Sequence, residues 1–104
     1  MTTKDFESVL KETILPKVMK MRDSGQKEYA QDTNDIFANF KREGKLLEIP
    51  KEKVLLTFFL KHIDGIIAHH NGYTSQRESI EGRYADAIVY LMLLWAKKNE
   101  EQGL

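Results

Sequence analysis

The chain has 104 residues, of which 41% are hydrophobic and 31% charged, and its 16 basic residues balance its 16 acidic residues. This length suits one domain with a single core, residues 1–104, and the balanced charge excludes general nucleic-acid binding through phosphate neutralisation. The sequence contains no cysteine, which excludes disulfides, thiol catalysis and cysteine-ligated zinc.

The apolar runs of the sequence are short. The longest, residues 54–60 and 87–96, fall below the ~20 apolar residues that a helix needs to span a bilayer. The polar N-terminus also lacks the apolar core of a signal peptide. We therefore expect a soluble cytoplasmic protein with no membrane partner.

The first predicted helix covers residues 4–22. Apolar residues recur there every three or four positions, at Phe6, Val9, Leu10, Ile14, Val18 and Met21. Pro16 removes one backbone hydrogen bond and crowds the preceding turn, so we expect a kink or two helical pieces. Residues 23–25 (Asp-Ser-Gly) predict a stop and a turn.

Residues 26–33 show no periodicity and are predicted to form a loop, in which Tyr29 either anchors the loop to the core or binds a ring. Thr33 or Asn34 is then expected to cap a short helix that ends near Gly44. Asn39 lies within that helix beside Phe40. Because asparagine is a poor residue for a helix interior, its amide is expected to make a buried hydrogen bond or a ligand contact.

Pro50 marks the start of a third helix that runs to about His70, with Gly72 as a left-handed stop. Its first half is apolar nearly all round, which predicts the central and most buried helix. Lys61 and Asp64 lie on its polar stripe. His62 lies among apolar residues and is either a satisfied structural group or a ligand. His69 and His70 are adjacent and therefore point too far apart to chelate one metal ion.

The last predicted helix covers residues 75–98. Ser75 and Glu78 form a capping box at its start, after which the helix is largely apolar. Steps of three and four place Arg83, Asp86 and Tyr90 on one narrow stripe. The pattern turns Asp86 toward the interior, where an unpaired charge is costly. It therefore forms either a structural ion pair with Arg83 or part of a polar site.

These elements predict an all-α fold, a compact bundle of about four helices. The third and last helices each carry one polar stripe and are apolar elsewhere, so we expect them to pack together. That packing would bring Lys61, His62 and Asp64 near the stripe of the last helix, which consists of Arg83, Asp86 and Tyr90.

Four short motifs follow one another along this chain. They are Lys27-Glu28-Tyr29-Ala30, Asn39-Phe40-Lys41, Lys61-His62, and the segment from Glu81 to Leu91. Together they resemble the nucleotide-modification-associated domain of small phage and prophage proteins, over about residues 20–97. The resemblance implies an all-helical, MazG-like fold, distantly similar to nucleoside-triphosphate pyrophosphohydrolases. It also implies a setting in phage nucleotide metabolism, and hence the host-cell cytoplasm if the chain is phage-encoded.

The sequence departs from the MazG-like pattern at one position. Those enzymes hold magnesium with a Glu-x-x-Glu pair and a later Glu-x-x-Asp pair, whereas here Arg83 stands three residues before Asp86. Asp64, Glu81 and Asp86 are the candidate metal ligands, and magnesium is the candidate cofactor. Lys61 and Arg83 would weaken cation binding and favour a phosphate.

Three functions remain open. The first is binding of a nucleotide or another phosphorylated small molecule. Its candidate ligand-binding residues are Lys27, Tyr29, Asn39, Phe40, Lys61, His62, Arg83 and Tyr90. The second is a magnesium-dependent nucleoside-triphosphate pyrophosphohydrolase. The third is a non-catalytic interaction module whose polar cluster is structural. Whether the chain catalyses any reaction is left open, and we expect a homo-oligomer because helical subunits of this size often bury further apolar surface by self-association.

Overall fold

The computed structural model describes residues 1–30, 34–73 and 77–103, and every regular element in these ranges is helical. In chain order the elements are α1 (Thr3–Val9), η1 (Leu10–Ile14), α2 (Leu15–Gly25), η2 (Gln26–Ala30), α3 (Ala38–Leu47), α4 (Lys51–His70) and α5 (Ile80–Glu101), where η denotes a π-helical turn. The prediction of an all-α bundle is confirmed. None of the helices in these ranges combines the length and the hydropathy that crossing a bilayer requires.

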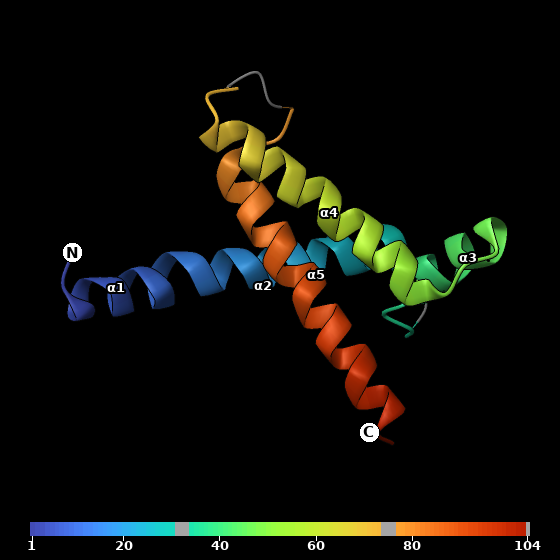
Figure 1. The fold of residues 1–104 in the computed structure, drawn as a ribbon. Helices are drawn as coiled ribbons and strands as arrows, with labels where there is room; N and C mark the ends of the chain where they lie inside the picture. The colour runs from blue at the N-terminus through green and yellow to red at the C-terminus, as the bar shows by residue number, and fades with distance from the viewer. Residues whose placement is uncertain (31–33, 74–76, 104) are drawn as a thin grey trace.

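The first four elements follow one another without a break and form one long helical rod (Figure 1). Thr2 caps the rod through a reciprocal pair of hydrogen bonds with Asp5. The π turn over residues 10–14 lies just before Pro16, at the start of α2. Because the proline ring lacks an N–H and crowds the turn before it, a local widening accommodates it. The predicted interruption therefore takes the form of a change in helix type.

The predicted stop at residues 23–25 is wrong, and so is the predicted loop over residues 26–30. The backbone N–H of Gln26 donates to the carbonyl oxygens of Arg22 and Asp23, so the helix continues. Burial of Val18 of α2 against α5 stabilises this rod, and tertiary packing of this kind outweighs a weak local turn preference. Residues 31–33 of the predicted loop lie outside the described residues, and they include Thr33, one of the two predicted caps.

The second predicted helix corresponds to α3. Asp35 supports its start, because the Asp35 carboxylate accepts a hydrogen bond from the backbone N–H of Phe37 at 3.0 Å. The helix runs past Gly44 to Leu47, which is further than predicted. Gly44 is buried inside it, where an added Cβ would lie 2.7 Å from the carbonyl oxygen of Ile49. This glycine therefore serves a close backbone approach and does not end the helix.

α4 begins and ends close to its predicted bounds. Pro50 is extended and precedes the helix as its N-cap residue, while Gly72 adopts the left-handed conformation that was predicted for the stop, with φ 93°. The last helix begins later than predicted. Ser79 caps α5 by accepting a hydrogen bond from the Gly82 N–H at 3.0 Å. Ser75, the predicted cap, lies outside the described residues.

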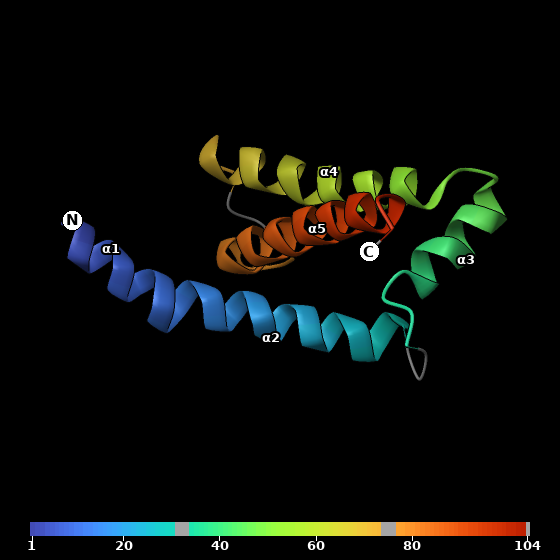
Figure 2. The ribbon, with the colours of Figure 1, turned by 90° about the horizontal axis from the view of Figure 1, so that it is seen from below.

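The helices are layered, with α5 between α4 and α2 (Figure 2). α3 lies at one end and connects the layer of the rod with that of α4 (Figure 2). The prediction that the third helix is central is therefore wrong. α4 packs on one side against α5 and leaves Leu56, Leu60 and Ile67 exposed on others. A helix that is apolar nearly all round is central only if other helices pack on all of its sides, and α4 does not have such neighbours among the described residues.

In the described part of the chain, the core consists of two buried groups, both packed against α5. The first joins Phe37 and Phe40 near α3 to Val54 and Leu55 of α4. The second consists of Val18, Ala85 and Val89, and links α2 to α5. Leu93 of α5 packs against both groups. The polar stripe of α5, which consists of Arg83, Asp86 and Tyr90, lies beside these two groups. Their close packing fixes the positions of the side chains next to the stripe.

Candidate functional site

Most of the polar residues predicted to meet at the α4–α5 interface lie around His62, whereas Asp64 is exposed. The imidazole ring is 5% exposed and stacks on the ring of Tyr90, with centroids 5.6 Å apart and planes 23° apart. Tyr90 in turn stacks on Phe58 at 6.0 Å and meets the edge of Phe40 at 6.3 Å. This column of rings from α3, α4 and α5 restrains the plane of the His62 imidazole.

Two carboxylates face the two ring nitrogens of His62. Glu78 Oε2 lies 3.6 Å from Nδ1, and Asp86 Oδ2 lies 3.6 Å from Nε2. These separations are too long for hydrogen bonds. Among the described residues, Nδ1 is the one buried side-chain nitrogen or oxygen without a hydrogen-bond partner. One ligand atom from each of His62, Glu78 and Asp86 falls within 4.8 Å of the others. We call these three residues the His62 cluster.

Burial favours the uncharged forms of His62 and Asp86. Burial lowers the pKa of His62, an effect that the nearby Asp86 and Glu78 oppose. Burial raises the pKa of Asp86, whose side chain is 25% exposed, and the attraction of His62 opposes this rise. Burial also raises the pKa of Tyr90 to about 12, so its phenol stays protonated at neutral pH.

Two cationic side chains flank the cluster. Lys61 Nζ lies 3.8 Å from Glu78 Oε1, so the two oxygens of Glu78 face different partners. The Arg83 guanidinium lies against α4 at Gly65, where an added Cβ would be 2.4 Å from it. Both cations lower the pKa of Asp86, and each does so less than His62 does. Cationic side chains therefore flank the two carboxylates of the His62 cluster.

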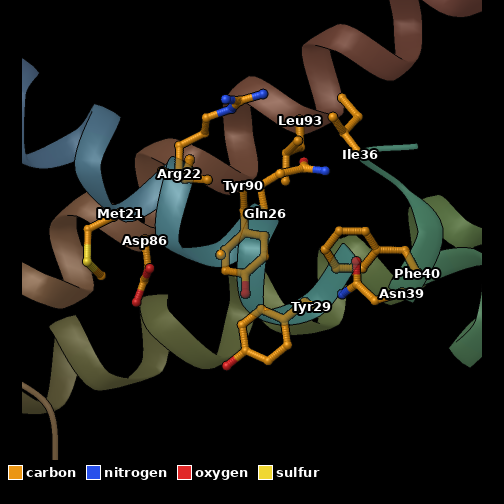
Figure 3. Close-up of a pocket in the computed structure, with 12 residues that line it drawn as sticks. Met21, Arg22, Gln26, Tyr29, Ile36, Asn39, Phe40, Asp86, Tyr90 and Leu93 are labelled. Carbon is orange, nitrogen blue, oxygen red and sulfur yellow. The ribbon is translucent and has the colours of Figure 1, made fainter. Parts of the chain in front are cut away.

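A pocket of about 80 Å³ opens beside the cluster, between α2, η2, α3 and α5. Its lining includes Tyr29, Asn39, Phe40, Asp86 and Tyr90, which were all predicted from the sequence as site residues. Figure 3 shows the rings of Tyr29, Phe40 and Tyr90 gathered at one part of this pocket, with the Asp86 carboxylate to one side. Burial raises the pKa of Tyr29 most, followed by Glu28, and the charges of Asp86 and Glu78 add smaller increases. The pocket residue Tyr29 is therefore close enough to the His62 cluster to sense its carboxylates.

The remaining predicted residues lie elsewhere. Lys27 is exposed on η2, outside the residues that line the pocket. Asp64 is exposed on α4, and Glu81 is exposed beside a different groove, which Thr13 and Lys17 also line. Within the described part of the chain, neither acid belongs to a group of potential metal ligands with Asp86. The predicted metal set of Asp64, Glu81 and Asp86 is therefore not brought together.

Sequence reasoning missed Glu78 because the capping box assigned its carboxylate to a helix end. In the fold, α5 starts after Glu78, and the Glu78 side chain reaches Lys61 and His62 of α4. Ser79 was the available signal, since a serine three residues before Gly82 offers an alternative cap. With Ser79 as the cap, the Glu78 carboxylate is not needed at the helix start and can contact α4.

Comparison of the chain with protein-family models, with curated proteins and with solved structures finds no match. The resemblance to the nucleotide-modification-associated domain thus remains a prediction from the four motifs.

Proposed function

We propose that this protein binds a small phosphorylated molecule with a planar ring, of the nucleotide class. The observation that carries the proposal is the shared pocket. Tyr29, Asn39, Phe40 and Tyr90 are far apart in the sequence, and all of them line it together with Asp86. Aromatic faces and a buried amide are groups that stack on a base and hydrogen-bond to its edge.

The pocket binds the ring in this proposal, and the flanking cations bind the phosphate. Lys61 lies 3.8 Å from Glu78 of the His62 cluster, and Arg83 lies against Gly65 of α4. Both cations lower the pKa of Asp86, which lines the pocket. Arginine offers a planar pair of donors that matches two phosphate oxygens, and lysine adds a mobile point charge. A ligand with a ring in the pocket and a phosphate near Arg83 would span both.

The size of the pocket requires one side chain to move. Its volume of about 80 Å³ is below the ~300 Å³ at which pockets for whole small molecules begin. Tyr29 is 52% exposed and stands at the end of the rod, so its ring can turn outward without disturbing the buried core. Ring entry is then coupled to rotation of Tyr29.

The test is a thermal-shift and calorimetric screen of the full chain against nucleoside mono-, di- and triphosphates, with a chelator present. A ligand that binds only the folded state raises the melting temperature. Tyr29→Ala and Arg83→Gln should each weaken binding, whereas Tyr73→Ala and Arg77→Gln are matched controls outside the pocket. No saturable binding to any member of the panel would contradict the proposal.

The hydrolase hypothesis has less support from this geometry. It required Asp64, Glu81 and Asp86 to hold magnesium together, and Asp64 and Glu81 lie apart from Asp86. Pyrophosphate release should therefore stay at background when magnesium is added to the same panel. Turnover that depends on magnesium and is lost in Asp86→Asn would favour the hydrolase.

We also propose that the chain forms a homo-oligomer. Its accessible surface of 7800 Å² exceeds by about 1,800 Å² the ~6,000 Å² typical of a folded monomer of 12.1 kDa. Its radius of gyration of 15.5 Å likewise exceeds the ~13 Å of a compact domain of this length. α1 and η1 bury no residue, and apolar side chains such as Leu15 and Met19 stay exposed on the rod.

The rod is the surface proposed for self-association, and a second copy of this chain is its partner. The balanced charge of the chain adds no net repulsion between copies. Sedimentation equilibrium should give at least a dimer, and Met19→Glu should dissociate it, whereas Lys17→Glu on the same helix should have little effect. A monomer at all concentrations would contradict this second proposal.

A further inference from the structure

The His62 cluster has features of a built ligand site that nucleotide binding does not require. Its imidazole is nine-tenths or more buried, and Nδ1 has no hydrogen-bond partner although Glu78 Oε2 stands 3.6 Å away. A buried polar atom left in this state costs free energy, so a native structure usually gives it a function or a ligand. The same 3.6 Å separates Nε2 from Asp86 Oδ2 on the other side of the ring.

These spacings suit a shared metal ion better than they suit hydrogen bonds. Zinc bonds to histidine nitrogen and carboxylate oxygen at about 2.0–2.2 Å, so two ligands of a tetrahedral ion lie about 3.3 Å apart. One ring nitrogen of His62 and one carboxylate oxygen from each of Glu78 and Asp86 lie within 4.8 Å of one another, and the 3.6 Å between Nδ1 and Glu78 Oε2 is close to the ligand spacing of such an ion. Because Asp86 faces the other ring nitrogen, its partly exposed side chain would turn toward Nδ1 to complete the ligand set.

The side chains around the cluster support this arrangement. The ring column of Phe58 and Tyr90 holds the imidazole plane, which is the kind of outer support that orients metal-ligating histidines. Glu78 divides its oxygens, with Oε1 toward Lys61 and Oε2 toward His62, so one oxygen remains for the ion.

We propose that His62, Glu78 and Asp86 bind one divalent transition-metal ion of the zinc class. One imidazole with two carboxylates favours ions such as zinc, cobalt or manganese, whereas magnesium and calcium prefer sites made of oxygen alone. Three protein ligands leave at least one coordination position open. A water molecule or an anionic oxygen can occupy it on the side of the adjoining pocket.

This site differs from the set predicted from the sequence, which relied on Asp64 and Glu81. It also does not depend on the proposed nucleotide binding, since metal binding can be measured with no nucleotide present. The two proposals can therefore fail separately.

The test is titration of the full, metal-free chain with cobalt(II), followed by its visible absorption, and with zinc by calorimetry. We expect one equivalent to bind, with weak or no binding of magnesium. Glu78→Gln and Asp86→Asn should each weaken zinc binding at least about tenfold. Asp64→Asn, Glu81→Gln and His69→Gln should leave it unchanged, because these residues lie outside the cluster.

His62→Gln should abolish the cobalt spectrum. Circular dichroism checks that this variant folds, and Glu78→Gln, at a partly exposed position, provides the test if it does not. Binding that persists in Glu78→Gln and Asp86→Asn but is lost in His69→Gln would overturn the proposal, as would the absence of saturable one-to-one binding.

Discussion

Tyr90 of α5 lies ring to ring with His62 of α4, and this stack joins the pocket that Tyr29 and Phe40 line to the His62 cluster. Both residues come from stripes that the sequence alone placed on separate helices. Their contact couples the packing of the core to the orientation of the one buried imidazole, since Tyr90 also packs against the Phe37 and Phe40 group.

Tyr90→Ala should destabilise the fold by about 3 kcal/mol, because it removes a large, mostly buried ring between Phe40, Phe58 and His62. Tyr90→Phe should cost much less, since it keeps the ring column. Chemical denaturation of both variants measures this difference. Equal losses in the two variants would show that the hydroxyl, and not the ring, carries the stabilisation.

Asp86→Asn should raise the melting temperature of the metal-free protein at pH 7. Burial raises the folded-state pKa of Asp86, so the ionised carboxylate is less favourable in the folded chain than in the unfolded chain. The amide removes that charge at a similar size. The same variant should lose metal binding, a common conflict between stability and function. A lower melting temperature would show that attraction to His62 outweighs the cost of burial.

Stability should fall as the pH drops below 6.5, the ordinary pKa of histidine. The folded-state pKa of His62 is lowered by burial, so the unfolded chain takes up the proton first and unfolding becomes easier. Asp86 and Glu78 oppose this effect, whereas Lys61 and Arg83 add to it. Denaturation of the wild type and of His62→Gln between pH 7.5 and 5 should show a flatter dependence in the variant. Parallel curves would assign the pH dependence to other groups.

Two helical glycines should respond in opposite ways to the same substitution. At Gly44 an added Cβ would lie 2.7 Å from the backbone oxygen of Ile49, which cannot move aside, so Gly44→Ala should cost about 1–3 kcal/mol. At Gly65 the three atoms nearest to the added Cβ all belong to the flexible end of Arg83. Because alanine favours a helix over glycine by ~1 kcal/mol, Gly65→Ala should be neutral or stabilising.

Gly65→Ala also tests the phosphate side of the proposed ligand site. It should displace the Arg83 guanidinium and weaken ligand binding without loss of stability, which thermal melting and calorimetry measure separately. Unchanged ligand affinity together with unchanged stability would place the phosphate away from Arg83.

The α4 bounds and the alignment of Asp86 with Tyr90 on one face of the last helix could be predicted because their causes are local. Pro50 precedes a helix start, Gly72 supplies a left-handed end, and steps of three and four align Asp86 with Tyr90 on any α-helix. An all-α fold follows from the same periodicity. These features depend on neighbours within one or two turns, which the sequence contains in full.

The tertiary structure decided what depends on distant partners. Packing of Val18 against α5 carries the rod through Gly25, despite a local turn signal. Helix periodicity says that a face is buried but not by which helix, so the middle place of α5 emerges only in the assembled fold (Figure 2). Glu78 joins His62 because α5 starts at Ile80 and the two helices pack side by side, and no spacing along the chain encodes that contact.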